Sequence, residues 1–200
     1  MQKMEIRDRQ LEIITAAGEI LGELGVTGLT TKRLAEKMGF AEAALYRHFR
    51  NKEDIIITLL NYLAANMEER LQSAIQGISD PAEQLAEIFN NQFDFFRQHP
   101  QFLVAIFSDG LLEASQGINS AIQQIMMVKR KWLLRIIADG QKQAVFRTDI
   151  PAEDLAHVIM GTFRLQMLQW RMGGYTFDLR VKGKKLMRSI FKLIQSPPIP

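Results

Sequence analysis

The sequence predicts an all-α protein, and three observations support this fold class. Apolar residues recur every three to four positions along nearly the whole chain, which places them on one face of a helix. No useful stretch alternates apolar and polar residues with the period of two that a half-buried strand requires. Proline is scarce, with six in 200 residues and three of these among the last four. We therefore expect a chain of about nine helices.

The first part of the chain predicts three helices separated by glycine-containing turns. Residues 8–24 carry apolar side chains on one helical face, and Gly25 is the expected stop. The second helix follows Thr30, which is suited to be its N-cap, and ends at Gly39. The third is expected at residues 41–49, and nine helical residues extend over about 13 Å.

The rest of the chain contains further helix start and stop signals. Asp80 followed by Pro81 is a strong start, because aspartate caps the first amides and proline suits the first helical position. Gly173 and Gly174 mark a stop. The predicted helices cover residues 52–77, 81–99, 100–107, 118–143, 152–172 and 178–194, with a connection at residues 108–118.

The segment from Thr30 to Lys52 predicts a DNA-binding element. Two short helices joined by a turn with glycine form a helix-turn-helix, in which the second helix enters the major groove. Basic residues are concentrated in this segment, where only Glu36 and Glu42 oppose them. They are Lys32, Arg33, Lys37, Arg47, Arg50 and Lys52.

This segment resembles the DNA-binding domain of the TetR family of transcriptional regulators. The resemblance covers roughly residues 8–55. It implies a three-helix DNA-binding domain, joined by a long helix to a larger helical ligand-binding and dimerisation domain. The matching residues are Thr30-Thr31, Leu34-Ala35, Gly39, Leu45-Tyr46-Arg47-His48-Phe49 and Asn51-Lys52-Glu53.

Individual DNA contacts follow from the helix-turn-helix geometry and the resemblance. Glu42 lies in the first turn of the second helix, where it either accepts a hydrogen bond from a cytosine or only favours the helix dipole. His48 is open between a groove contact and a structural role. Lys52 begins a helix whose amides attract an anion such as a phosphate. The predicted DNA-binding residues are Thr31, Lys32, Glu42, Ala43, Tyr46, Arg47, His48 and Lys52.

Large adaptable side chains after residue 80 suggest an effector pocket. The chain holds ten Met and twelve Phe, which suit a pocket that rearranges around an apolar ligand. A well-packed core is the competing interpretation of the same residues. The candidate pocket residues are Phe89, Phe93, Phe96, Phe107, Met126, Trp132, Phe163, Arg164, Met167 and Trp170.

We expect two domains and a homodimer. Residues 1–52 form the predicted DNA-binding domain, and residues 53–200 the effector-binding and dimerisation domain. In the TetR family the last two helices of each subunit form a four-helix bundle, which implies dimerisation through residues 152–172 and 178–194. The expected function is that of a repressor, released from a palindromic double-stranded DNA operator by a small, apolar effector.

Composition limits the location of the protein and the chemistry it could perform. The net charge of +3 excludes indiscriminate coating of nucleic acid. The absence of cysteine excludes disulfides and thiolate chemistry and is typical of a reducing cytoplasm. The N-terminus lacks the apolar core of a signal peptide, and the longest apolar run, residues 102–107, falls far short of the ~20 residues that span a bilayer. A cytoplasmic protein without a membrane partner is expected.

Two alternatives remain open. A helical carboxylate metal enzyme would need a Glu-x-x-His motif on each of two helices, but the chain offers only the related pair Asp154 and His157. No nucleophile elbow or glycine-rich phosphate loop is present, so no enzyme, cofactor or metal is expected. The second alternative keeps the DNA-binding domain but makes the remainder a protein-interaction platform without a small ligand.

Overall fold

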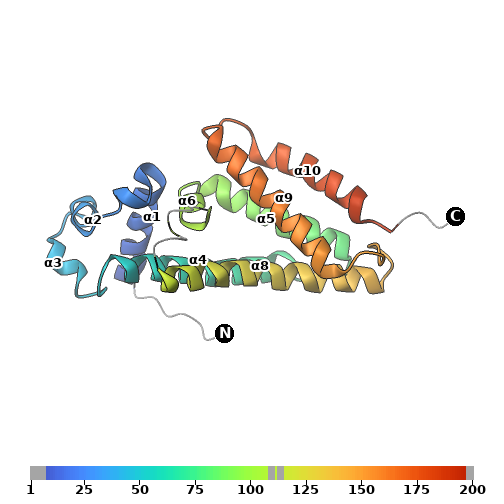
Figure 1. Ribbon diagram of the computed structural model, residues 1–200, viewed down its shortest axis with the longest axis horizontal. Helices are drawn as coiled ribbons and strands as arrows, with labels where there is room; N and C mark the ends of the chain where they lie inside the picture. The colour runs from blue at the N-terminus through green and yellow to red at the C-terminus, as the bar shows by residue number, and fades with distance from the viewer. Residues whose placement is uncertain (1–7, 108–110, 112–114, 197–200) are drawn as a thin grey trace. The chain divides into compact units, whose positions relative to one another are not determined.

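The protein is all-α in the computed structural model, which describes residues 8–107, 111 and 115–196 (Figure 1). Within these residues nine helices are present and no strand; the only extended pairing there is an isolated bridge between Phe146 and Gln195. No helix in the same part of the chain is long and apolar enough to span a membrane. The helices are α1 (Asp8–Gly28), α2 (Thr31–Met38), α3 (Glu42–Leu45), α4 (Lys52–Ala74), α5 (Pro81–Gln98), α6 (Phe102–Phe107), α8 (Gln116–Lys142), α9 (Ala152–Met172) and α10 (Leu179–Ile194).

The described residues divide into two compact units. The first, within residues 1–67 and 99–126, contains α1, α2, α3, α6 and the first parts of α4 and α8. The second, within residues 68–98 and 127–200, contains α5, α9, α10 and the remaining parts of α4 and α8.

The first unit is built around α1, which packs against α2 and α6. Ile13, Ile14 and Leu21 are fully buried on one face of α1. Gly18 lies directly against α6: a Cβ atom there would come within 2.5 Å of a ring carbon of Phe102. The small residue therefore sets how closely α1 and α6 approach.

The predicted glycine and threonine signals near the N-terminus have clear structural roles. Gly25 adopts φ 71° and interrupts α1, although the helix then continues to Gly28, so the expected stop is a kink. The Thr30 side chain accepts a hydrogen bond from the Arg33 amide at 3.1 Å and caps α2 as predicted. Gly39 adopts the left-handed conformation, φ 70°, and ends α2.

The third helix is shorter than predicted. The sequence suggests residues 41–49, but α3 covers only Glu42–Leu45. The next residues form tighter turns, in which the His48 amide donates to the Leu45 carbonyl at 2.9 Å. This turn places Phe49 in the core, where it is 3% exposed. The regular part of α3 is therefore about 6 Å long rather than about 13 Å.

The later helices follow the predicted boundaries closely. Asp80 caps α5 by accepting from the Ala82 amide at 3.0 Å, and Asp178 caps α10 through the Arg180 and Val181 amides. Of the predicted connection at residues 108–118, residues 108–110 and 112–114 lie outside the described residues, and α8 already begins at Gln116.

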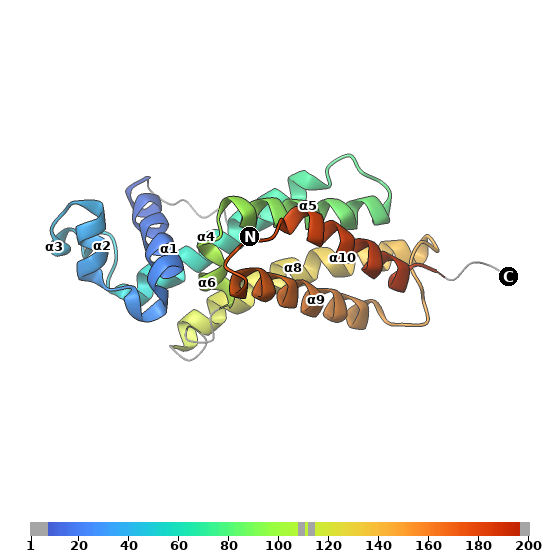
Figure 2. The ribbon, with the colours of Figure 1, turned by 90° about the horizontal axis from the view of Figure 1, so that it is seen from above.

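The second unit packs α5 against α10, side by side as Figure 2 shows. Gly183 of α10 lies against the ring of Phe93 of α5, since a Cβ atom there would be 2.5 Å from a ring carbon. The Asp94 carboxylate of α5 lies 3.4 Å from the Arg180 guanidinium of α10. Close apolar contact and an ion pair thus hold these two helices together.

Candidate nucleic-acid interface and aromatic interior

The α2–α3 pair is held by its apolar face and by its connecting turn. Leu34 of α2 and Leu45 of α3 are buried, with 0% and 1% of their surfaces exposed. At the turn, the amides of Gly39 and Phe40 donate to carbonyls of α2. This arrangement fixes the start of α3 relative to α2, as a helix-turn-helix requires.

Two predicted DNA contacts bond to each other across this pair. The Thr31 hydroxyl donates a hydrogen bond of 2.5 Å to the Glu42 carboxylate, and the pair is partly buried. Thr31 is the first residue of α2 and Glu42 the first of α3. The bond joins the starts of the two helices. It occupies the side chains of two residues that the sequence predicts to contact DNA.

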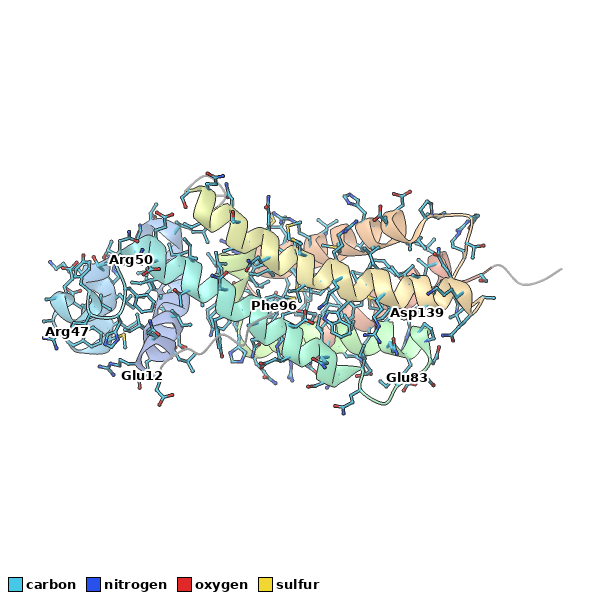
Figure 3. The ribbon with its side chains drawn as sticks, turned by 90° about the horizontal axis from the view of Figure 1, so that it is seen from below. Glu12, Arg47, Arg50, Glu83, Phe96 and Asp139 are labelled. Atoms are coloured by element: carbon cyan, nitrogen blue, oxygen red, sulfur yellow. The ribbon has the colours of Figure 1, made fainter. Side chains whose placement is uncertain are left out.

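Exposed cations surround α3. The side chains of Lys32, Arg47, Arg50 and Lys52 are exposed, and within the described residues no carboxylate lies within ion-pair distance of any of them. Arg47 and Arg50 lie on the segment between α3 and α4 (Figure 3). Unpaired surface cations of this kind can neutralise phosphates and release counterions. Arg50 is absent from the DNA contacts predicted from the sequence, although its place in the basic segment could have indicated such a role.

The other two basic residues of the segment have partners within the protein. The Lys37 ammonium lies 3.0 Å from the Glu19 carboxylate, and this hydrogen-bonded contact raises the pKa of Lys37. The Arg33 guanidinium donates to the Gly28 carbonyl at 2.5 Å. These two side chains brace α2 against α1 and the α1–α2 connection.

The start of α4 is capped from within the chain. The Asn51 side chain accepts from the Asp54 amide at 2.8 Å, and the Asp54 carboxylate accepts from the Arg50 amide at 3.1 Å. The Glu53 carboxylate accepts from the Ser115 hydroxyl at 2.6 Å. Lys52 remains exposed at this helix start. The neighbouring carboxylates of Glu53 and Asp54 already offset part of the positive potential of the α4 N-terminus, which would otherwise attract a phosphate.

The remaining predicted DNA-contacting residues lie in the same region. Ala43 is exposed, and 53% of the Tyr46 surface is exposed. His48 is half-buried, and its backbone carbonyl accepts from the Gln10 side chain at 3.3 Å. The structure thus brings all eight predicted residues to α2, α3, the segment after α3 and the start of α4, and their contacts with DNA stay a prediction.

A cluster of four phenylalanines forms part of the interior of the second unit. Phe163 of α9 packs against Phe89 and Phe93 of α5, with ring centroids 5.6 Å apart in both cases. Phe96 of α5 lies 6.3 Å from the same ring. All four were predicted as pocket residues, and all four are at most 3% exposed.

Lys129 of α8 lies in this aromatic cluster. Its ammonium is 3.1 Å from the centroid of Phe163 and 5.5 Å from that of Phe89, and the residue is only 8% exposed. Desolvation lowers the pKa of Lys129 well below its usual value, and no ion pair or hydrogen bond among the described residues compensates. A cation–π contact stabilises a desolvated ammonium by about 2 kcal/mol, whereas burying an ammonium costs several kcal/mol. The rings therefore offset only part of this cost.

Gln92 is a second polar residue in the same region. It is fully buried on α5, and neither its amide nitrogen nor its carbonyl oxygen has a hydrogen-bond partner in the part of the chain that the structure describes. Gln92 and Lys129 are absent from the sequence-predicted pocket. The sequence signal that could have identified them is a polar residue within an apolar helical stripe. Lys129, for example, lies between Ile125 and Leu133 on such a stripe.

The other predicted pocket residues are more dispersed. Trp132 and Met167 are buried in the second unit, and no described residue forms a hydrogen bond with the indole nitrogen of Trp132. Trp170 is buried there too and donates to the Phe177 carbonyl at 3.0 Å. Arg164 is exposed on α9. Phe107 and Met126 belong to the first unit, where Met126 is 48% exposed.

An apolar stripe runs along the exposed face of α9. Val158, Leu165, Leu168 and Met172 are between 41% and 78% exposed, at the spacing of one helical face. A Cβ atom at Gly161, on the same face, would meet nothing within 4 Å. Val181 and Leu193 of α10 are each 66% exposed. Large apolar side chains gathered on a surface typically mark an interaction site.

Comparisons with known proteins cover nearly the whole chain. A family described as "Bacterial regulatory proteins, tetR family" matches residues 13–59, and one described as "YsiA-like protein, C-terminal region" matches residues 62–196. The chain is 24% identical over 170 residues to the HTH-type transcriptional repressor KstR2 of Mycobacterium tuberculosis (strain ATCC 25618 / H37Rv), covering 85% of each protein. It is 24% identical over 193 residues to the Fatty acid metabolism regulator protein of Bacillus subtilis (strain 168), covering 95% of each.

Solved structures show the same fold. The fatty acid degradation regulator FadR of Bacillus halodurans aligns with a TM-score of 0.84 at 20% identity, over 94% of this chain and 97% of that one. FadR of Bacillus subtilis, solved in complex with stearoyl-CoA, aligns with a TM-score of 0.80 at 23% identity, over 92% and 96%. Within the described residues no group of three or more His, Cys, Asp or Glu side chains is placed to hold a metal ion.

Proposed function

Because the chain belongs to the TetR family of bacterial regulatory proteins, we propose that it is a dimeric repressor released from a palindromic operator by a small apolar effector. The family makes the chain a DNA-binding transcriptional regulator and not an enzyme, so the metal-enzyme alternative is rejected. The proposal assigns DNA binding to residues 1–52 and effector binding and dimerisation to residues 53–200.

Operator binding rests on the exposed cations around α3. Lys32, Arg47, Arg50 and Lys52 have no ion-pair partner among the described residues, so they are free to contact phosphates. In this proposal Glu42 and Ala43, the first two residues of α3, face base edges. This arrangement of unpaired charge around a helix-turn-helix is the observation that carries the proposal.

Dimerisation is assigned to α9 and α10. The exposed apolar stripe of α9 would be buried by a second copy, as would Val181 and Leu193 of α10. Two subunits related by a two-fold axis read half-sites about 34 Å apart, or a multiple of this distance, which explains the expectation of a palindrome.

Effector binding is assigned to the aromatic interior of the second unit. The relatives named for fatty acid metabolism, and the FadR structure in complex with stearoyl-CoA, support an effector with a large apolar part. Helix α4 contributes residues to both units, so we propose that it couples effector binding to the DNA-binding residues. A coupling of about 1 to 3 kcal/mol would change operator affinity roughly 5- to 150-fold.

The test begins with DNA from upstream of the protein's own gene. Nuclease protection should reveal an inverted repeat, and fluorescence anisotropy then gives the operator affinity with and without candidate effectors. We expect at least a fivefold loss of affinity with the correct effector. Equal affinities across a broad library of apolar molecules would instead favour the protein-interaction platform.

A further inference from the structure

Among the described residues, Lys129 has no ion-pair partner. Its ammonium lies over the rings of Phe163 and Phe89, and the residue is more than nine-tenths buried. The rings cannot fully replace the water that the ammonium loses. Such a group either gives up its proton or is stabilised by something that completes the site, for example an anion that arrives with a ligand.

Gln92 belongs to the same buried surface. It lies three residues after Phe89 on α5 and four before Phe96, so the three side chains share one face of the helix. Phe89 is also the ring that lies beside the Lys129 ammonium, at 5.5 Å. Gln92 and Lys129 are therefore both neighbours of Phe89, and neither hydrogen-bonding group of Gln92 has a partner among the described residues.

We propose that Lys129 and Gln92 form a binding subsite for the carboxylate of an apolar monocarboxylic acid, whose hydrocarbon part packs among Phe89, Phe93, Phe96 and Phe163. One ammonium neutralises one negative charge, which fits a carboxylate better than a phosphate. The two carboxylate oxygens can accept from the Lys129 ammonium and from the Gln92 amide. This inference rests on the proposed effector function and names the chemical class of the effector.

The test uses two probes that differ only in the polar group, decanoate and 1-decanol, titrated calorimetrically into the full chain. A hydrogen bond to a charged group lowers a dissociation constant by a factor of about ten or more. The wild type should therefore bind decanoate at least ~10-fold more tightly than decanol. Lys129→Met should abolish this preference by weakening decanoate binding far more than decanol binding. Lys142→Met, at the exposed end of the same helix, should keep the wild-type preference.

Thermal unfolding of the ligand-free proteins separates a binding role from a structural one. If Lys129 serves a ligand, Lys129→Met should unfold at a higher temperature than the wild type, because an unpaired buried charge has been removed. A lower unfolding temperature together with an unchanged decanoate preference would show that Lys129 is only a structural contact, and would overturn the proposal. If Lys129→Met does not fold, Gln92→Leu must reduce the decanoate preference by weakening decanoate binding more than decanol binding.

The remaining outcomes distinguish this inference from the proposed function. Equal binding of decanoate and decanol by the wild type, or binding of neither, would overturn the carboxylate subsite. A neutral effector that still releases the operator would then leave ligand-relieved repression intact. Decanoate that binds through Lys129 without changing operator affinity would support the subsite and contradict repression relieved by this ligand.

Discussion

The hydroxyl of Thr31 donates a hydrogen bond of 2.5 Å to the carboxylate of Glu42, joining the first residue of α2 to the first residue of α3. In the free protein this bond holds a negative charge at the start of the short helix that is proposed to enter the major groove. We therefore expect Glu42 to weaken attraction to DNA in general and to favour a sequence that offers a hydrogen-bond donor.

Replacing Glu42 with alanine should relax specificity. Loss of the carboxylate removes repulsion from phosphates, so affinity for unrelated DNA should rise several-fold, and loss of a base contact should cost about 1–3 kcal/mol at one operator position. Fluorescence anisotropy with the operator, single-base variants and a scrambled duplex measures both effects. Thr31→Val is the control, because it breaks the bond and keeps the charge. If Glu42→Ala leaves the ratio of operator affinity to scrambled-duplex affinity unchanged, Glu42 makes no base contact and serves only as the hydrogen-bond acceptor of Thr31.

Replacing Lys52 with alanine should weaken binding to all DNA sequences similarly. A lost phosphate contact lowers the slope of log affinity against log salt by about 0.9 per half-site. Lys37→Ala is the matched control, because Lys37 is engaged by Glu19 and should leave the slope unchanged. If both variants give the wild-type slope, the Asn51 cap and the carboxylates of Glu53 and Asp54 have already satisfied this helix start, and Lys52 is not a phosphate ligand.

The sequence predicted the fold well because its helix boundaries are set by local chemistry. Thr30, Gly39 and Asp80 act within a few residues of themselves, and their roles as caps and stops are seen in the structure. The extent of α3 was not predictable in the same way. It is set by the burial of Phe49, which depends on packing with residues distant in the sequence.

The candidate sites show the same division. The burial of Phe89, Phe93 and Phe96 follows from helical periodicity, because an apolar stripe on α5 must face another apolar surface. The position of Lys129 among those rings was not predicted, because a lysine in a stripe usually extends to solvent. Only the tertiary contact with Phe163 and Phe89 shows that this ammonium is enclosed.

Replacing Leu165 with glutamate should dissociate the dimer. Leu165 is 54% exposed on the apolar stripe of α9, so a charge there would be buried without a partner in the proposed four-helix bundle. Sedimentation velocity at micromolar concentration should show a monomer, and operator affinity should fall because one subunit reads only a half-site. Met127→Glu, on an exposed position of α8, should remain dimeric. A dimeric Leu165→Glu variant would place the interface elsewhere.

Replacing Gly183 with alanine should destabilise the contact between α5 and α10. The new methyl group would lie 2.5 Å from a ring carbon of Phe93, and overpacking of this kind costs about 1–3 kcal/mol. Urea unfolding should show a lower midpoint with an unchanged dependence on denaturant. Lys184→Ala, at the exposed neighbouring position, should change stability by less than about 0.5 kcal/mol. A neutral Gly183→Ala would mean that Phe93 can move aside.

The pH dependence of stability should reveal the buried lysine directly. Desolvation holds the pKa of Lys129 well below 10.5 in the folded protein, whereas the unfolded chain keeps the ordinary value. Between these two values the unfolded state binds more protons than the folded state. The contribution of Lys129 to the free energy of unfolding must therefore rise with pH across this window, by at most about 1.4 kcal/mol per pH unit.

Lys129→Met removes this titration, so the difference in unfolding free energy, wild type minus variant, should increase with pH in the alkaline range. Below the lowered pKa the difference should be constant and most unfavourable to the wild type, because Lys129 is then charged in both states. Urea unfolding at a series of pH values measures the difference, with Lys142→Met as the exposed control. A difference that stays flat up to pH 10.5 would mean that Lys129 keeps its proton in the interior, fully compensated by the rings of Phe163 and Phe89.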